Sequence, residues 1–281
     1  MKNFGRKIEL LIADQTGHAL DLSGFRVVFA VEKSAAEQPN KAHIEITNLS
    51  ETTASYLLNG DMKRIVLQAG YEDNFGVIFD GNIISATRTI DGTESTTVID
   101  AGDGDNAYSY SIVNQTISSG YSSKDIANTV GNAMSERGTR GIDASGVEET
   151  IKYPRGRTMF GASRDYARLV AKSSQCQWSI QDGQVVFCKQ MAAREGVIAF
   201  VLTPESGLIG SPVSDKDGVT ALACLNPQLK IYDPLQIESR FVNGTYKILS
   251  VKHSGDTHGN TWQTEVKATA IDQSTKQTTK A

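Results

Sequence analysis

Three aspartates that are close neighbours in sequence are the first residues that could carry chemistry. Asp100, Asp103 and Asp105 offer carboxylate oxygens at a spacing that resembles calcium sites. The EF-hand loop requires a glutamate at its twelfth position, however, and Ser111 stands there if Asp100 is the first ligand. We therefore interpret the segment as an acidic, glycine-rich link between two domains, with metal binding as the lesser alternative.

Two histidines near the C-terminus form a second candidate site. His253 and His258 flank a turn that contains Asp256, and two imidazoles with a carboxylate could bind zinc. Hairpin turns, however, often collect Gly, Asp, Asn and Ser for conformational reasons. The other histidines, His18 and His43, lie far away in sequence. A structural role in a hairpin is therefore favoured over a metal site.

Two cysteines could form a disulfide across a predicted hairpin. Cys176 and Cys188 flank Asp182-Gly183, a strong hairpin signal. A two-residue turn there pairs Gln177 with Cys188 and places the two thiols on opposite faces, which disfavours the bond. No histidine lies near either cysteine in sequence, which disfavours a nucleophilic role. Because the chain has 3 cysteines, an odd number, we expect synthesis in a reducing cytoplasm.

Basic residues surround Gly156-Arg157-Thr158, the predicted start of a helix. They are Lys152, Arg155, Arg164 and Arg168. A phosphate could bind at such a position, but no glycine-rich P-loop is present, so solvated surface charges are the preferred interpretation. The sequence also contains no GxSxG, HExxH, Rossmann or CxxC motif. We therefore assign no catalytic, cofactor-binding or metal-binding residue and predict no enzymatic activity.

The composition is that of a folded protein with several units. The 281 residues are 39% hydrophobic and 21% charged, and 25 glycines against 6 prolines suit many tight turns. The net charge is −4 without a basic run, which disfavours sequence-specific or tight general nucleic-acid binding. No apolar stretch reaches the roughly 18–20 residues of a membrane span. The N-terminus has no apolar segment typical of a secretory signal.

Periodicity divides the chain into three expected domains. Residues 1–105 alternate as strands, with one helix capped by Ser50, and the expected strands include His43–Thr47, Arg64–Tyr71, Val77–Thr89 and Thr96–Ala101. Residues 106–190 are expected to be an α+β domain. It contains a helix capped by Ser122 or Ser123, a helix over Thr158–Ser173, and the Asp-Gly hairpin. Residues 191–281 return to strands and end in a polar tail.

The last part of the chain carries a specific series of turns. Gly244–Lys252 and Trp262–Ala268 alternate as two strands of a hairpin, and the turn between them is Ser254-Gly255-Asp256-Thr257-His258-Gly259-Asn260. With Leu208-Ile209-Gly210-Ser211-Pro212, Asp217-Gly218 and Leu225-Asn226-Pro227, this order resembles the C-terminal part of tail hub, or baseplate hub, proteins of tailed bacteriophages, including the late control protein D group. The strand and Asn-Leu-Ser of Pro39–Ser50 also resemble this family.

The resemblance implies a fold and a function. The expected fold is mainly β with an α+β insertion, that is, two small tube-like β-barrels, 1–105 and 191–281, plus a helix-hairpin domain, 106–190. The expected function is that of a structural virion protein of the tail or baseplate. Three copies would form a ring of six barrels that joins the tail tube to the tail tip or spike and leaves a channel for DNA. The implied partners are the tail tube protein, the tip or spike protein and other baseplate proteins, with the tape measure protein as a further candidate.

The alternative is a cell-wall-acting enzyme or a carbohydrate-binding β-module of a phage tail. An acidic pair in a groove, or aromatic residues exposed in a row, would favour it. For the hub, three chains of charge −4 carry −12 in total. We expect a neutral or acidic channel surface, to which Asp100–Asp105 and Asp215–Asp217 could contribute, with basic side chains turned towards partner interfaces.

Overall fold

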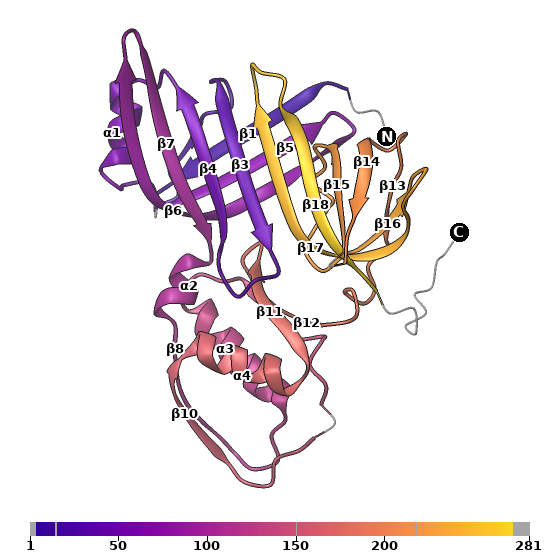
Figure 1. Cartoon of the computed structure of the whole chain (residues 1–281). Helices are drawn as coiled ribbons and strands as arrows, with labels where there is room; N and C mark the ends of the chain where they lie inside the picture. The colour runs from indigo at the N-terminus through magenta and orange to yellow at the C-terminus, as the bar shows by residue number, and fades with distance from the viewer. Residues whose placement is uncertain (1–3, 15, 150, 217, 272–281) are drawn as a thin grey trace.

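Two β-rich halves lie side by side above a smaller part that contains helices and short sheets (Figure 1). The computed structural model describes residues 4–14, 16–149, 151–216 and 218–271. No helix of these residues is long and apolar enough to cross a membrane. The elements of the first half are β1 (Arg6–Ala13), β2 (Ala19–Asp21), β3 (Val27–Ser34), β4 (Asn40–Thr47), α1 (Glu51–Leu58), β5 (Arg64–Tyr71), β6 (Asn74–Asp91) and β7 (Glu94–Asp103).

The remaining elements form the lower part and the second half. The lower part contains α2 (Asp105–Tyr110), β8 (Ile112–Ile117), α3 (Ser123–Ser135), β9 (Gly141–Asp143), β10 (Arg157–Ala162), α4 (Ser163–Ser173), β11 (Cys176–Gln181) and β12 (Gln184–Lys189). The second half contains β13 (Phe200–Leu202), β14 (Leu208–Ser214), β15 (Val219–Cys224), β16 (Pro234–Glu238), β17 (Asn243–Asp256) and β18 (Trp262–Ala270).

The strands of both halves belong to one continuous sheet. Its main path runs β14-β15-β18-β17-β3-β4-β7-β6-β5-β1-β2, and β16 and β13 branch from β17. The expectation of two separate barrels missed this connection, because β3 and β17 are far apart in sequence and pair directly. Strand pairing within the described residues closes no barrel.

Three hydrophobic clusters stabilise the molecule. The first lies within the first half but also includes Leu225 and Trp262 from the second half. The second cluster lies in the lower part, where α3 packs on α4 and α4 packs on β11, and the third lies in the second half. The β11–β12 hairpin contributes to both of these, because Trp178 belongs to the second cluster and Val186 to the third. The hairpin thus packs against two hydrophobic cores, one on each of its faces.

Local sequence signals predicted several elements correctly. Ser50 caps α1, and Ser122 caps α3 in a capping box with Asp125. The helix predicted over Thr158–Ser173 is wrong in its first part, because only Ser163–Ser173 is helical. Residues 157–162 form β10 instead, where the buried Met159 lies between exposed neighbours with the period of a strand.

Candidate assembly site at the seam between the two β halves

The seam is the antiparallel pairing of residues 28–34 of β3 with residues 250–256 of β17. His253 lies opposite Val31 at its centre. Both strands alternate between buried and outward-facing side chains, so the pairing continues a buried face and an exposed face from one half into the other. The seam therefore fixes the position of the two halves relative to each other.

On the buried face, an aromatic residue of the second half enters the core of the first. The ring centroids of Trp262 and Phe29 are 5.5 Å apart in an edge-to-face arrangement. The Trp262 indole Nε1 donates a hydrogen bond of 3.1 Å to the Gly70 carbonyl oxygen. Gly255 lies directly opposite both rings in the sheet, and a Cβ atom there would overlap the Phe29 ring. Glycine at this position makes the aromatic contact possible.

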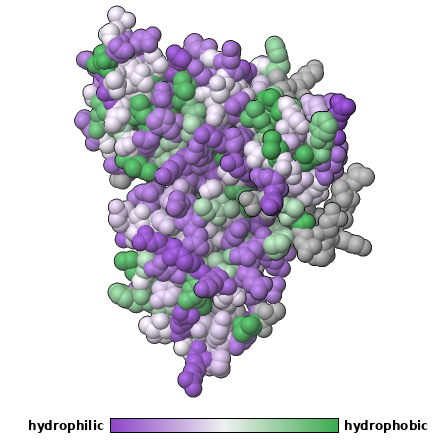
Figure 2. Space-filling model, viewed as in Figure 1, coloured by the Kyte–Doolittle hydropathy of each residue, from purple (hydrophilic) through white to green (hydrophobic). Residues whose placement is uncertain are grey.

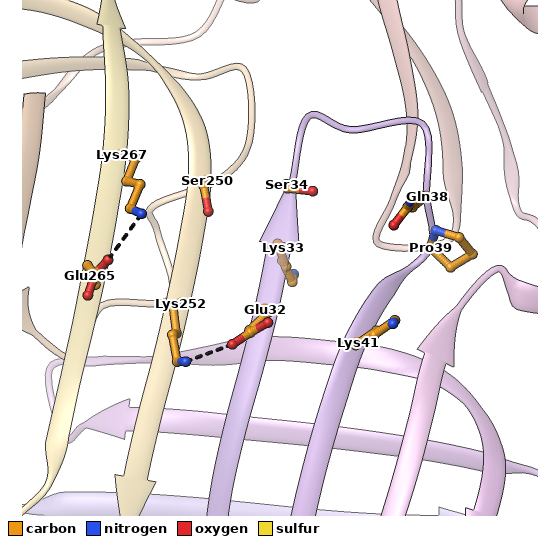
Figure 3. A pocket seen from close by; sticks show the side chains of 10 residues that line it. All are labelled: Glu32, Lys33, Ser34, Gln38, Pro39, Lys41, Ser250, Lys252, Glu265 and Lys267. Atoms are coloured by element: carbon orange, nitrogen blue, oxygen red, sulfur yellow. Dashed lines mark hydrogen bonds and ion pairs between the residues drawn. The ribbon is translucent and has the colours of Figure 1, made fainter. Parts of the chain in front are cut away.

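On the exposed face, charged side chains of alternating sign form a row across four strands. The register places Lys41 of β4 beside Glu32 of β3, Glu32 beside Lys252 of β17, and Lys252 beside Glu265 of β18. The Lys252 Nζ lies 2.7 Å from the Glu32 Oε1 across the seam (Figure 3). In the neighbouring position, the Lys267 Nζ lies 3.9 Å from the Glu265 Oε1. Most charges of this row therefore balance within the face.

On the buried face, the seam contains the ion pair of a buried lysine and a buried histidine. The Lys33 ammonium contacts the Asp182 carboxylate from the β11–β12 turn, and the Lys33 residue is only 6% exposed. Burial opposes ionisation of Asp182, but Lys33 outweighs it and lowers the pKa of that carboxyl. Burial lowers the pKa of His253 to about 3, and the nearby Lys33 charge adds to this effect. His253 is therefore neutral, and its Nδ1 lies 2.9 Å from the Thr264 hydroxyl.

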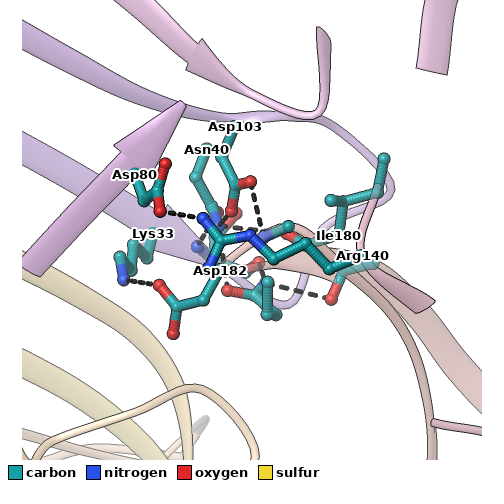
Figure 4. A network of polar contacts seen from close by, with 11 residues as sticks. Lys33, Asn40, Asp80, Asp103, Arg140, Ile180 and Asp182 are labelled. Atoms are coloured by element: carbon teal, nitrogen blue, oxygen red, sulfur yellow. Dashed lines mark hydrogen bonds and ion pairs between the residues drawn. The ribbon is translucent and has the colours of Figure 1, made fainter. Parts of the chain in front are cut away.

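A polar network connects the same turn to the first half (Figure 4). The Gly183 backbone N–H donates a hydrogen bond of 2.8 Å to Asp103, and Asn40 donates one of 3.0 Å to the Ile180 carbonyl. Asp103 is 2% exposed, and burial raises the pKa of its carboxyl to about 6 although Lys33 opposes the shift. The Gln181 amide donates a hydrogen bond of 2.7 Å to a β3 carbonyl. The turn is thus held by satisfied buried polar groups.

The second half holds the other side of the hairpin. The Tyr232 and Ser179 hydroxyl oxygens are 2.9 Å apart. The fully buried Lys247 donates a hydrogen bond of 2.6 Å from its Nζ to the Lys189 carbonyl, and its ammonium lies 4.9 Å from the Tyr232 ring centroid. The hairpin therefore bonds to both halves close to the seam, and together these contacts make a junction of all three parts of the chain.

The structure separates the three aspartates of the acidic segment. Asp100 lies on the exposed face, where its Oδ1 is 2.8 Å from the His43 Nδ1. Asp103 is buried in the junction, and Asp105 lies in the first turn of α2. The segment is the end of a strand and the start of a helix, and it leads from the first cluster to the second. Within the described ranges, no three His, Cys, Asp or Glu side chains are grouped to hold a metal ion.

The histidine candidates do not converge either. His253 is buried, whereas His258 lies in the exposed turn between β17 and β18. Asp256 accepts a hydrogen bond of 2.9 Å from the His258 backbone N–H and pairs with Arg26 at 2.9 Å. The segment forms the turn of the β17–β18 hairpin.

The cysteine and arginine candidates have local roles. Cys176 and Cys188 are free thiols, and the register that pairs Gln177 with Cys188 is confirmed. Of the predicted basic patch, Arg168 pairs with Glu37 of the first half at 2.7 Å, and Arg164 donates a hydrogen bond of 3.3 Å to the Tyr108 carbonyl. These two arginines therefore bind other parts of the chain.

Sequence reasoning missed the two buried lysines. Lys33 stands in the buried phase of β3 after Val27, Phe29 and Val31, and this phase was a signal that it points inwards. Lys247 occupies a buried position of β17. A lysine in a buried strand phase requires a partner, but its identity depends on the fold.

Comparison with known proteins agrees with this architecture. The family described as baseplate hub gp41 matches residues 11–268. No curated protein matches the chain. Among solved structures, a 43 kDa tail protein of prophage MuSo2 from Shewanella oneidensis has a TM-score of 0.63 at 10% identity, over 95% of this chain and 97% of that chain.

Two further structures share the fold. A tail protein from Neisseria meningitidis MC58 has a TM-score of 0.65 at 8% identity, over 94% of this chain and 96% of that chain. The c3393 protein of E. coli, described as a component of the type VI secretion system, has a TM-score of 0.57 at 9% identity, over 88% and 74%. Because the family match covers most of its length, the chain belongs to the baseplate hub gp41 family, structural components of the phage tail and baseplate.

Proposed function

We propose that three copies of this chain form a ring that joins the tail tube to the tail tip or spike and leaves a channel for DNA. Each copy contributes two β halves, which we regard as the two tube-like units of domains 1–105 and 191–281, with 106–190 as the domain between them. Three copies then present six units to a sixfold tube and three to a threefold tip. The observation that carries the proposal is the seam, which joins the two halves of one hub-family chain into one sheet.

The exposed face of the seam is our candidate for the channel lining. Hydrophilic side chains cover the strands on either side of the seam (Figure 2). Phosphates bind to clustered, unpaired lysines and arginines, whereas the Lys252 and Glu32 charges are only 2.7 Å apart here. Basic residues lie on this face, and acidic neighbours balance most of them. Such a face would hold DNA at most weakly and let it pass.

The copies would meet through side chains rather than by pairing their sheet edges. At one end of the sheet, β14 contains Pro212 and a register shift between Ile209 and Val213. At the other end, β2 has only three residues. Proline, irregularities and short strands protect edges against pairing. Ile209 and Val213 are 41% and 66% exposed, and hydrophobic side chains gather near β14 and β15 in Figure 2.

The further partners follow from this placement. The ring would bind the tail tube protein on one side, and the tip or spike protein and other baseplate proteins on the other, with the tape measure protein as a candidate inside. We further propose that the chain is made in the host cytoplasm and assembled there into the tail.

No observation favours the alternative of a wall-acting enzyme or carbohydrate-binding module. Exposed aromatic residues lie on separate elements, with Tyr56 on α1, Phe160 on β10 and Phe241 before β17. Zymography on bacterial cell wall tests the enzyme directly, and we expect no cleared band. A band that disappears on substitution of one carboxylate would establish the enzyme instead.

The hub proposal is tested by sedimentation of the purified protein over a wide concentration range. We expect a species of three times the chain mass that grows with concentration at the expense of the monomer. A closed ring predicts that association stops at three. A monomer that persists at the highest concentration, or association that continues without limit, would contradict the proposal.

A further inference from the structure

The exposed face of the seam contains a groove of about 410 Å³. The Ser34–Ser250 pair of the seam forms part of its lining (Figure 3). Its lining combines four lysines, two glutamates, two serines, Gln38 and Pro39, and the lysines are Lys33, Lys41, Lys252 and Lys267. We propose that this groove is a binding site for phosphate esters of a nucleic-acid backbone.

The ion pairs of the lining leave cationic groups available. Glu32 holds Lys252 at 2.7 Å, and the buried Lys33 is satisfied by Asp182. Lys267 is held only loosely by Glu265, at 3.9 Å. Lys41 forms no ion pair with any residue that the structure describes. Two ammonium groups, Lys41 and Lys267, are therefore the ones that a phosphate can engage without breaking a close pair.

The shape and chemistry of the groove favour a phosphodiester over other ligands. The two glutamates of the lining lie beside Lys252 and Lys267, at 2.7 and 3.9 Å. The remaining lysine, serine and glutamine side chains offer mainly hydrogen-bond donors, which suit phosphate oxygens. The volume of about 410 Å³ exceeds that of a single small anion and lies in the range of ligand pockets. A short stretch of nucleic-acid backbone, with its sugars towards the solvent side of the groove, matches both the polarity and the volume of the groove.

The binding should be weak and should depend on salt. Two neutralised phosphates on duplex DNA give a slope of about −1.8 in log affinity against log salt. Affinity then falls about twelvefold between about 50 and 200 mM salt. A contact of this strength is compatible with passage of DNA in the proposed hub, but the site belongs to the single chain. Its failure would leave the three-chain proposal intact.

Fluorescence anisotropy of a short labelled DNA duplex, titrated with the full chain at both salt concentrations, tests the site. For Lys41→Gln, which removes one contact, we expect the salt effect to fall from about twelvefold to between about three- and fourfold. Lys172→Gln removes another exposed charge, on α4 and away from the groove, and should retain the full effect. Thermal melting of each variant checks that it is folded.

Two competitors identify the ligand chemistry. Inorganic pyrophosphate should displace the duplex, and its own affinity shows whether a free phosphate suffices or the polymer is needed. Both of these outcomes support a phosphate site. Equal loss of binding in Lys41→Gln and Lys172→Gln would overturn the proposal. Equally strong displacement by an acidic peptide of matched charge would also overturn it, because the groove would then recognise charge alone.

Discussion

Lys252 and Glu32 form an ion pair across the seam, although 220 positions separate them in the sequence. Their side chains are 46% and 61% exposed, so solvent weakens the attraction. A double-mutant cycle with Lys252→Gln and Glu32→Gln should give a coupling free energy of about 0.2–1 kcal/mol. Urea unfolding at low and high salt measures it, and the coupling should shrink at high salt. A coupling of several kcal/mol would mean that this pair, and not the buried face, holds the halves together.

A substitution on the buried face should cost more stability than loss of this ion pair. Gly255→Ala places a methyl group against the Phe29 ring, with Trp262 on the other side. Overpacking of this kind costs about 1–3 kcal/mol. Gly24→Ala is the matched control, because no atom beyond its own chain neighbours lies within 4 Å of the added Cβ. Urea unfolding of both variants decides the point, and equal stability would show that the aromatic contact adapts without strain.

His253 should make the protein less stable as pH falls. Its pKa is lowered from 6.5 to about 3 in the fold, so the unfolded chain binds one more proton between these values. The stability that the neutral imidazole contributes above pH 6.5 is therefore lost as pH falls. Between about pH 7 and pH 5 the loss should be about 2 kcal/mol.

The effect of His253 is isolated by comparison with variants. The wild-type advantage in unfolding free energy over His253→Gln should shrink by about 2 kcal/mol between about pH 7 and pH 5. His258→Gln is the control, because it retains the buried His253 imidazole. Urea unfolding at several pH values gives both differences. A wild-type advantage over His253→Gln that stays constant down to pH 5 would show that the imidazole is protonated in the fold.

Local features of the fold could be predicted from the sequence, whereas the junction could not. The Ser50 cap, the strand Arg64–Tyr71 and the Asp182-Gly183 hairpin depend on residues close in sequence. The seam depends on which strand pairs with β3. Many strands of the chain share the same alternation of apolar and polar residues, so this pattern does not identify the partner. Asp103 is an example. The sequence around it is typical of an acidic link between domains, whereas in the fold its carboxyl is buried against the β11–β12 turn.

Val213 provides the test of how copies meet. Its side chain is 66% exposed on β14, and Ile209 on the same strand is 41% exposed. In the proposed ring, burial of such side chains favours association by about 25 cal/mol per Å² of apolar surface. Val213→Asp would bury a carboxylate in this contact and should weaken association by about tenfold or more, which corresponds to at least about 1.4 kcal/mol. The melting temperature of the monomer should stay the same, because the side chain is exposed there.

Sedimentation at matched concentrations compares Val213→Asp with the wild type, and Ile198→Asp serves as the control. Ile198 is 90% exposed, lies before β13 and is outside the strand that we assign to the contact. If β14 carries the interface, Val213→Asp shifts the trimer towards monomer and Ile198→Asp does not. A shift with Ile198→Asp alone would move the interface to the segment before β13. Trimers of undiminished stability in both variants would exclude this side of the second half as the contact between copies.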